Sequence, residues 1–255
     1  MNKTITIRQS IKKTTETRYR KMTLGTIFTA VVAFFAPIGT GIWIAVKHRK
    51  YTRALLFGVL TFTVFQVLLR IPLLQFVLPN MNWFLIMTAI MPMFTAAFYG
   101  ITASLFEELG RYLVMKLSLK NHTSFFDGLA FGIGHGGIEA VLLVGVNALI
   151  LLFYPSSVVS SLSMFAGGME RIFAMTCHIA WSVMVMKSVR EKKLRWLFIP
   201  LVLHAVLDTG VMIASTYSVS LLAIEIGLGI FAAIMAFYIL IEYKKGKAVN
   251  HEEII

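Results

Sequence analysis

The sequence is poor in cysteine and in acidic residues, and both shortages restrict what the protein can be. Its single cysteine, Cys177, excludes an internal disulfide and is more typical of packing in an apolar segment. Asp and Glu number 12 against 24 Lys and Arg, which gives a net charge of +12. The chain has no Gly-rich phosphate loop, no CxxC pair and no RNA-binding aromatic motif. We therefore expect no nucleic-acid partner.

Charged residues are also scarce, at 14% of the chain, whereas 58% of the residues are hydrophobic. Apolar runs long enough to cross a bilayer then predict an all-α, polytopic membrane protein with about seven transmembrane helices. No internal repeat, long linker or low-complexity segment interrupts the chain, so we expect one transmembrane domain over residues 23–243. A basic N-terminal tail (1–22) and a short cytoplasmic tail (244–255) would flank it. The predicted spans are 24–46, 52–78, 83–117, 124–152, 166–188, 195–213 and 219–242.

The connections between the apolar runs differ sharply in charge. Fourteen Lys and Arg residues lie in residues 47–53, in the third and fifth connections and in the C-terminal tail, whereas the other connections carry none. Basic loops face the cytoplasm, so the pattern predicts a cytoplasmic C-terminus in a cell membrane, and we expect a bacterial one. The basic tail at residues 1–22 would then lie on the opposite side, which this rule does not explain. It lacks a small-residue cleavage site, so we do not expect a cleaved signal peptide.

Ionisable side chains recur at one depth of the predicted bundle. Glu107, His135, His178 and His204 lie on four different runs, each roughly 12–16 Å along its helix from the basic side. Groups of this kind inside a membrane are costly and are functional by default. A shared layer of them predicts a catalytic or ion-binding site.

Residues four apart on a helix share one face, so this spacing predicts partners for several of these groups. Glu107 and Arg111 have this spacing, so we expect Arg111 to neutralise Glu107 and leave Glu108 free. By the same spacing, a carboxylate would orient each of two histidines: Glu139 would orient His135, and Asp208 would orient His204.

Two arginines and a glycine-rich segment each allow two interpretations. Arg171 either counters a carboxylate or, as we favour, snorkels towards the outer surface. Arg70 either marks a helix end or pairs with a distant acid. The glycines around His135, in the segment 132–137, allow close helix packing or a local opening of the helix.

Four segments in order resemble one family. They are EELGRY (107–112), GIGHGGIEA (132–140), ERIFAMTCHIAWS (170–182) and LHAVLDTG (203–210). Together they resemble the superfamily of CAAX proteases and bacteriocin-processing proteins, which are intramembrane glutamic proteases, and most closely its YhfC branch, with PrsW-type proteases as near relatives. Asp208 stands where the CAAX-protease pattern commonly has Asn. This difference affects the identity of the expected substrate more than the expected reaction.

The resemblance implies hydrolysis of a peptide bond in or near the bilayer. The substrate would be a membrane-embedded or lipid-anchored peptide or protein. Glu107, or alternatively Glu108, would activate a water, since a carboxylate removed from water is a stronger base. His135 would hold that water, His204 and Asp208 would stabilise the oxyanion, and Arg111 would orient the glutamates. The expected site comprises Glu107, Glu108, Arg111, His135, Glu139, His178, His204 and Asp208.

Three alternatives remain open from the sequence. Three histidines with carboxylates could hold Zn²⁺, but there is no HExxH motif, and Arg111 places a cation beside the acids, so we expect no cofactor. An ion- or metal-coupled transporter would also use such a layer, although no inverted repeat is visible. A non-catalytic scaffold that binds a membrane partner is the third.

Overall fold

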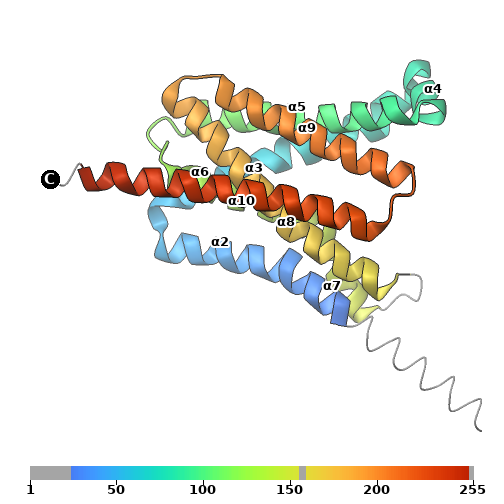
Figure 1. Cartoon of the computed structure of the whole chain (residues 1–255), viewed down its shortest axis with the longest axis horizontal. Helices are drawn as coiled ribbons and strands as arrows, with labels where there is room; N and C mark the ends of the chain where they lie inside the picture. The colour runs from blue at the N-terminus through green and yellow to red at the C-terminus, as the bar shows by residue number, and fades with distance from the viewer. Residues whose placement is uncertain (1–23, 155–158, 253–255) are drawn as a thin grey trace, which may run out of the picture.

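The computed structural model describes residues 24–154 and 159–252, and within these ranges the chain contains helices and no strand (Figure 1). This confirms the predicted all-α class. The predicted N-terminal tail, residues 1–22, lies outside the described part of the chain.

Six helices in the described ranges are long and apolar enough to cross a membrane. The first, Leu24–Lys47, ends with α2 (Ala36–Lys47), and the second, Arg49–Asn80, contains α3 (Thr52–Phe62). The third, Phe125–Phe153, comprises α6 (Phe125–Ala140) and α7 (Val146–Phe153). The others are α8 (Ser161–Glu191), α9 (Arg195–Thr216) and Leu221–Lys245, the apolar part of α10 (Leu221–Glu252).

The run predicted as one span over 83–117 is instead broken into two helices. α4 (Asn82–Ile90) and α5 (Pro92–Ser118) meet at Met91 with a bend of 117°. Pro92 explains the break, because proline has no backbone N–H and disfavours helical geometry in the residue before it. A count of seven spans holds only if this bent pair is one span. The 27 residues of α5 are about 40 Å long, which exceeds the hydrocarbon core.

The two ends of the bundle carry different connections. The turns α2–α3 and α8–α9 lie at the end where α10 finishes, on the left in Figure 1. These are basic connections, and we call this end the basic end. The α9–α10 turn and the start of the first described helix lie at the opposite end.

Apolar packing closes the bundle near the basic end. One buried cluster draws on six helices, and each of its members lies near the basic end of its helix. Among the described residues, apolar side chains therefore fill the half of the bundle near the basic end. The cluster is formed by Ile44, Ala54, Leu55, Met115, Leu119, Ala130, Phe131, Val185, Met186 and Leu197.

Close approach of α3 and α6 requires two glycines. A Cβ atom at Gly58 would collide with the carbonyl oxygen of Phe131, and one at Gly134 would collide with that of Leu55. The glycine-rich segment around His135 therefore packs helices together. This contact holds His135 at a fixed position against its neighbours.

Candidate functional site

Two adjacent glutamates on α5 form the centre of the candidate site. Glu107 is 3% exposed and Glu108 is fully buried. Successive residues of an α-helix point about 100° apart, so the two carboxylates contact different neighbours. Their separate partners define two halves of the site.

Glu108 is held between two donors. Its Oε1 atom forms a very short ion pair with Nη1 of Arg111 and lies 2.9 Å from Nδ1 of His204. The expected ion pair between Arg111 and Glu107 is present, at 3.5 Å. The expectation that this pair would leave Glu108 free is wrong, because Arg111 contacts Glu108 more closely. The reason is that the partner on α9, His204, faces the Glu108 side of α5.

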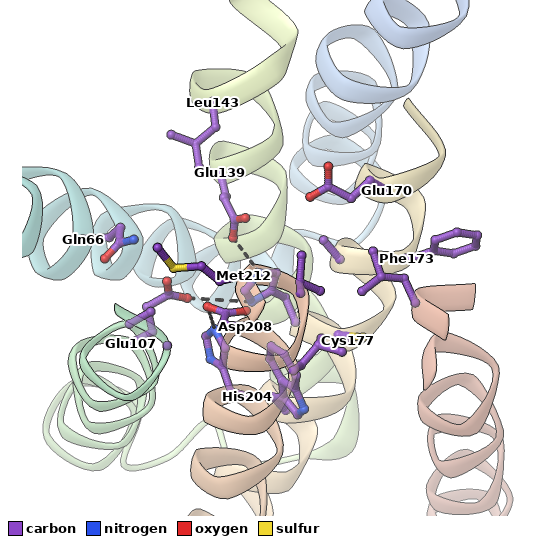
Figure 2. Close-up of a pocket in the computed structure, with 18 of the residues that line it drawn as sticks. Gln66, Glu107, Glu139, Leu143, Glu170, Phe173, Cys177, His204, Asp208 and Met212 are labelled. Carbon is purple, nitrogen blue, oxygen red and sulfur yellow. Dashed lines mark ion pairs between the residues drawn. The ribbon is translucent and has the colours of Figure 1, made fainter. Parts of the chain in front are cut away.

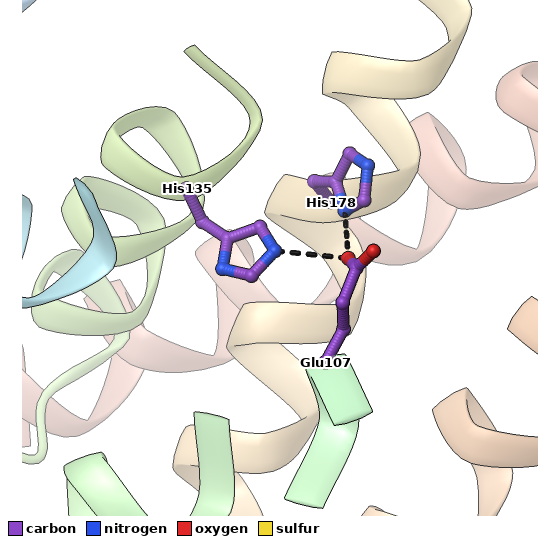
Figure 3. Close-up of side chains that lie close together, drawn as sticks. All are labelled: Glu107, His135 and His178. Carbon is purple, nitrogen blue, oxygen red and sulfur yellow. Dashed lines mark hydrogen bonds and ion pairs between the residues drawn. The ribbon is translucent and has the colours of Figure 1, made fainter. Parts of the chain in front are cut away.

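Glu107 faces the other two histidines. Its Oε2 atom lies 3.0 Å from Nε2 of His135 and 3.9 Å from Nδ1 of His178 (Figure 3). α5, α6 and α8 each supply one of these side chains. The structure thus brings two of the three histidines of the predicted layer to Glu107, whereas the third, His204, contacts Glu108.

His178 has charged neighbours on both sides of its ring. Its Nδ1 atom lies 2.7 Å from Nη2 of Arg111, and its Nε2 atom lies 2.5 Å from Oε2 of Glu139. A guanidinium only donates hydrogen bonds, so Nδ1 of His178 accepts from Arg111. The His178 ring therefore connects Arg111 on α5 to Glu139 on α6.

Glu139 does not orient His135 as the spacing predicted. Its carboxylate contacts α8 instead, through His178 and through Arg171 at 2.8 Å. Arg171 also forms a short ion pair with Glu170 and is only 8% exposed. It therefore counters carboxylates, which was the alternative expectation, and the favoured expectation that it snorkels is wrong. Spacing of four residues puts His135 and Glu139 on one face of α6, but each side chain finds its partner on a different helix, α5 or α8.

The predicted His204–Asp208 pair is present. Nε2 of His204 lies 3.4 Å from Oδ2 of Asp208. Trp181 stacks on the imidazole, with ring centroids 4.3 Å apart and an interplanar angle of 16°. This stacking fixes the plane of the ring. No pattern in the sequence distinguished Trp181 from other apolar residues of its helix.

A cavity of about 330 Å³ opens above this layer (Figure 2). Glu107, His178, His204 and Asp208 line it, whereas Glu108, Arg111 and His135 lie behind its wall. On α5 the lining residues end at Glu107, and on α9 they begin at His204. Glu139 and Leu143 lie on the same helix above the layer in Figure 2. The cavity therefore occupies the half of the bundle away from the basic end, with the ionisable layer at its base.

The cavity wall also contains two polar residues that the sequence did not assign to the site. Gln66 and Arg70 belong to the π-helical stretch Thr63–Arg70, inside the continuous helix Arg49–Asn80. Arg70 therefore does not mark a helix end. A buried charge within an apolar run is a functional signal by itself, and this signal could have placed Arg70 in the site.

Three of the side chains could offer ligand atoms to a metal ion. One atom each from Glu107, His135 and His178 lies within 4.8 Å of the others. However, Arg111 donates to Nδ1 of His178 and lies 3.5 Å from Oε2 of Glu107. Its guanidinium occupies a ligand atom and places a positive charge where a divalent ion would bind. In this arrangement the three residues do not fit a metal.

Comparison with known proteins gives two matches. The family model described as YhfC intramembrane metalloprotease matches residues 32–161 and 155–232. The membrane protein YhfC of Bacillus subtilis (strain 168) is 28% identical over 239 residues, covering 83% of this chain and 92% of the relative. No solved structure matches the chain significantly.

Proposed function

Because this chain belongs to the YhfC intramembrane metalloprotease family, we propose that it is an intramembrane endopeptidase whose attacking water is activated by Glu107. The observation that carries the proposal is the position of Glu107. Of the two adjacent glutamates it alone lines the cavity, and histidines from two other helices surround it. Glu108 is behind the wall, where it can orient other groups but cannot reach a water in the cavity.

In the proposed reaction Glu107 takes a proton from a water molecule, and the water oxygen attacks the carbonyl carbon of the scissile peptide bond. When the tetrahedral intermediate collapses, the C–N bond breaks and Glu107 passes the proton to the leaving nitrogen. One water is consumed, and a carboxyl and an amino terminus are produced. His135, at 3.0 Å, positions the Glu107 carboxylate throughout.

His204 is the residue that we assign to the oxyanion. Its two ring nitrogens lie 2.9 Å from Glu108 and 3.4 Å from Asp208, and a ring with an acceptor at each nitrogen is best satisfied when both nitrogens carry protons. A positively charged ring at the base of the cavity would stabilise negative charge that develops on the carbonyl oxygen. Asp208 and Trp181 would hold the ring in place.

The proposed mechanism uses no metal, although the family description contains the word metalloprotease. The reason is Arg111, which contacts two of the three possible ligand residues. A zinc-dependent mechanism would require Arg111 to move away from both Glu107 and His178.

We expect the purified protein in liposomes to cleave members of a quenched-fluorescence peptide library at the same rate with and without a strong chelator. A zinc protease assayed in parallel shows that the chelator is effective. Loss of cleavage on chelation, with recovery after Zn²⁺ is added back, would contradict the metal-free mechanism and leave the protease activity standing.

A transporter finds less support in the arrangement of the helices. A transport pathway must reach both sides of the membrane in turn. In the described residues, the cavity lining stops at the ionisable layer, and packed apolar side chains fill the bundle beyond it. Proton or metal flux in the same liposomes that depends on Glu107, without peptide cleavage, would favour the transporter.

We also propose that the basic end of the bundle is cytoplasmic, from the charge of its loops. The cavity would then open towards the outer side of the membrane, because its lining residues lie away from the basic end. The substrate would reach the site from that side or from the outer leaflet.

Labelling of single cysteines in intact cells tests this orientation, with Cys177→Ala as the background. Tyr217→Cys, on the α9–α10 connection, and Met212→Cys, in the cavity wall, are expected to react with a membrane-impermeant maleimide. Lys193→Cys, whose native side chain is 56% exposed between α8 and α9, should react only after the membrane is permeabilised. The reverse pattern would place the cavity opening in the cytoplasm.

A further inference from the structure

Arg70 is a buried cation in the wall of the cavity, and it is 7% exposed. Three neutral acceptors hold its guanidinium. It donates to the carbonyl oxygen of Tyr99 at 2.7 Å, to Oγ1 of Thr102 at 3.2 Å and to Oε1 of Gln66 at 3.3 Å. The side chain is thus fixed in position by groups that do not balance its charge.

The other two arginines of the site differ in this respect. Arg111 and Arg171 each form ion pairs with two glutamates. In the described parts of the chain, no carboxylate oxygen lies within 4.0 Å of the Arg70 guanidinium. An arginine has five N–H donors, and the three bonds of Arg70 leave one free on each terminal nitrogen. A guanidinium can bind a carboxylate through two N–H donors of this kind.

The position of Arg70 relative to Glu107 is also defined. Its partners Thr102 and Tyr99 precede Glu107 on α5 by five and eight residues. These separations correspond to roughly 7–12 Å along the helix, towards the open half of the cavity. An extended peptide covers this distance with about two to four residues.

We propose that Arg70 is an anion-binding subsite that takes a carboxylate of the substrate, either an acidic side chain or the free C-terminus. The subsite rests on the proposed protease function, and it adds a preference for substrates that carry this group two to four residues from the scissile bond. Gln66, Tyr99 and Thr102 position the guanidinium. Glu107 and Asp208 line the same cavity and would repel a carboxylate placed close to them, so the preference depends on position.

The alternative role for Arg70 is a general balancing charge for Glu107 and Asp208. Such a role would affect all substrates equally. Binding of matched peptides separates the two roles and does not depend on cleavage. The probes are fluorescent apolar peptides of Leu, Ala and Val with a free C-terminal carboxylate, with a C-terminal amide, or with the amide and one internal Glu.

Fluorescence anisotropy with Glu107→Gln protein in nanodiscs is the primary measurement. We expect at least one carboxylate peptide to bind roughly 10- to 100-fold more tightly than the neutral amide, the difference expected for a charge-assisted hydrogen-bond pair. When Glu107→Gln is combined with Arg70→Gln, the two kinds of peptide should bind with equal affinity. When it is combined with Arg70→Lys, part of the difference in affinity should remain. The free C-terminus and the internal Glu identify the source of the carboxylate. Arg53→Gln, an exposed arginine of the same helix, should leave the ratio unchanged.

Equal binding of acidic and neutral peptides, or no binding of either carboxylate peptide, would overturn the subsite. An equal loss for all peptides in Arg70→Gln would instead indicate the balancing charge. Wild-type protein is then assayed for cleavage of the same peptides. An acid preference in binding without any cleavage would retain the subsite and contradict the protease function, so the two failures are distinguishable.

Discussion

Replacing Glu107 by glutamine is expected to lower peptide cleavage by about 10²- to 10⁴-fold, the contribution of a general base. Glutamine has nearly the same shape and can remain beside His135, which lies 3.0 Å from the native carboxylate. It cannot take a proton from water. The protein should therefore stay folded and lose kcat. Cleavage rates in liposomes and thermal unfolding in detergent measure the two effects separately.

Glu108→Gln is the matched control, because it removes the same charge one residue further along α5. Glu108 does not line the cavity and contacts Arg111 and His204. We expect this change to lower stability by about 1–3 kcal/mol and to reduce activity less than Glu107→Gln does. If Glu108→Gln abolished cleavage while Glu107→Gln kept it, Glu108 would be the base and the assignment would be wrong.

Replacing Arg111 by methionine is expected to have the largest effect on stability. The fully buried guanidinium contacts Glu107, Glu108 and His178. Its loss removes the arginine partner of two buried carboxylates and leaves Glu108 with His204 alone. Breaking a buried ion pair in this way costs about 3–5 kcal/mol. The stability of Arg111→Lys should lie between those of the wild type and Arg111→Met, since a single ammonium cannot contact all three groups. The midpoint of unfolding in detergent gives the order of the three proteins.

A double variant tests whether the Arg111 effect arises from the unpaired charge. Arg111→Met with Glu108→Gln removes both members of the closest pair, and it should be more stable than Arg111→Met alone. If the two losses simply added, the pair would not be coupled. A fully stable and active Arg111→Met protein would show that the guanidinium does not hold the site together, and it would reopen the question of a metal beside Glu107.

Much of the fold was predictable because a bilayer requires long apolar helices and tolerates few charged residues within them. Length and hydrophobicity predicted the helices, and the matches to the family model and to the Bacillus subtilis protein confirm the YhfC resemblance drawn from four short motifs. The layer of Glu107, His135, His178 and His204 was predictable because helix rise converts residue number into depth. Asp208 was correctly paired with His204. Both lie on one helix, and among the described residues no other carboxylate lies closer to Nε2 of His204.

The class of fold, the family and the depth of the ionisable groups therefore follow from the amino-acid sequence alone. Which of these groups meet depends on the folded protein, because side-chain partners depend on how helices rotate and pack against one another. This rotation placed Arg111 closest to Glu108, turned Glu139 towards His178, and directed Glu107 and Arg70 to one cavity. Hydropathy also does not predict the bend of 117° at Met91, which arises from the backbone restrictions of the following proline. Nor does it predict the apolar packing at the basic end, which depends on contacts between distant segments.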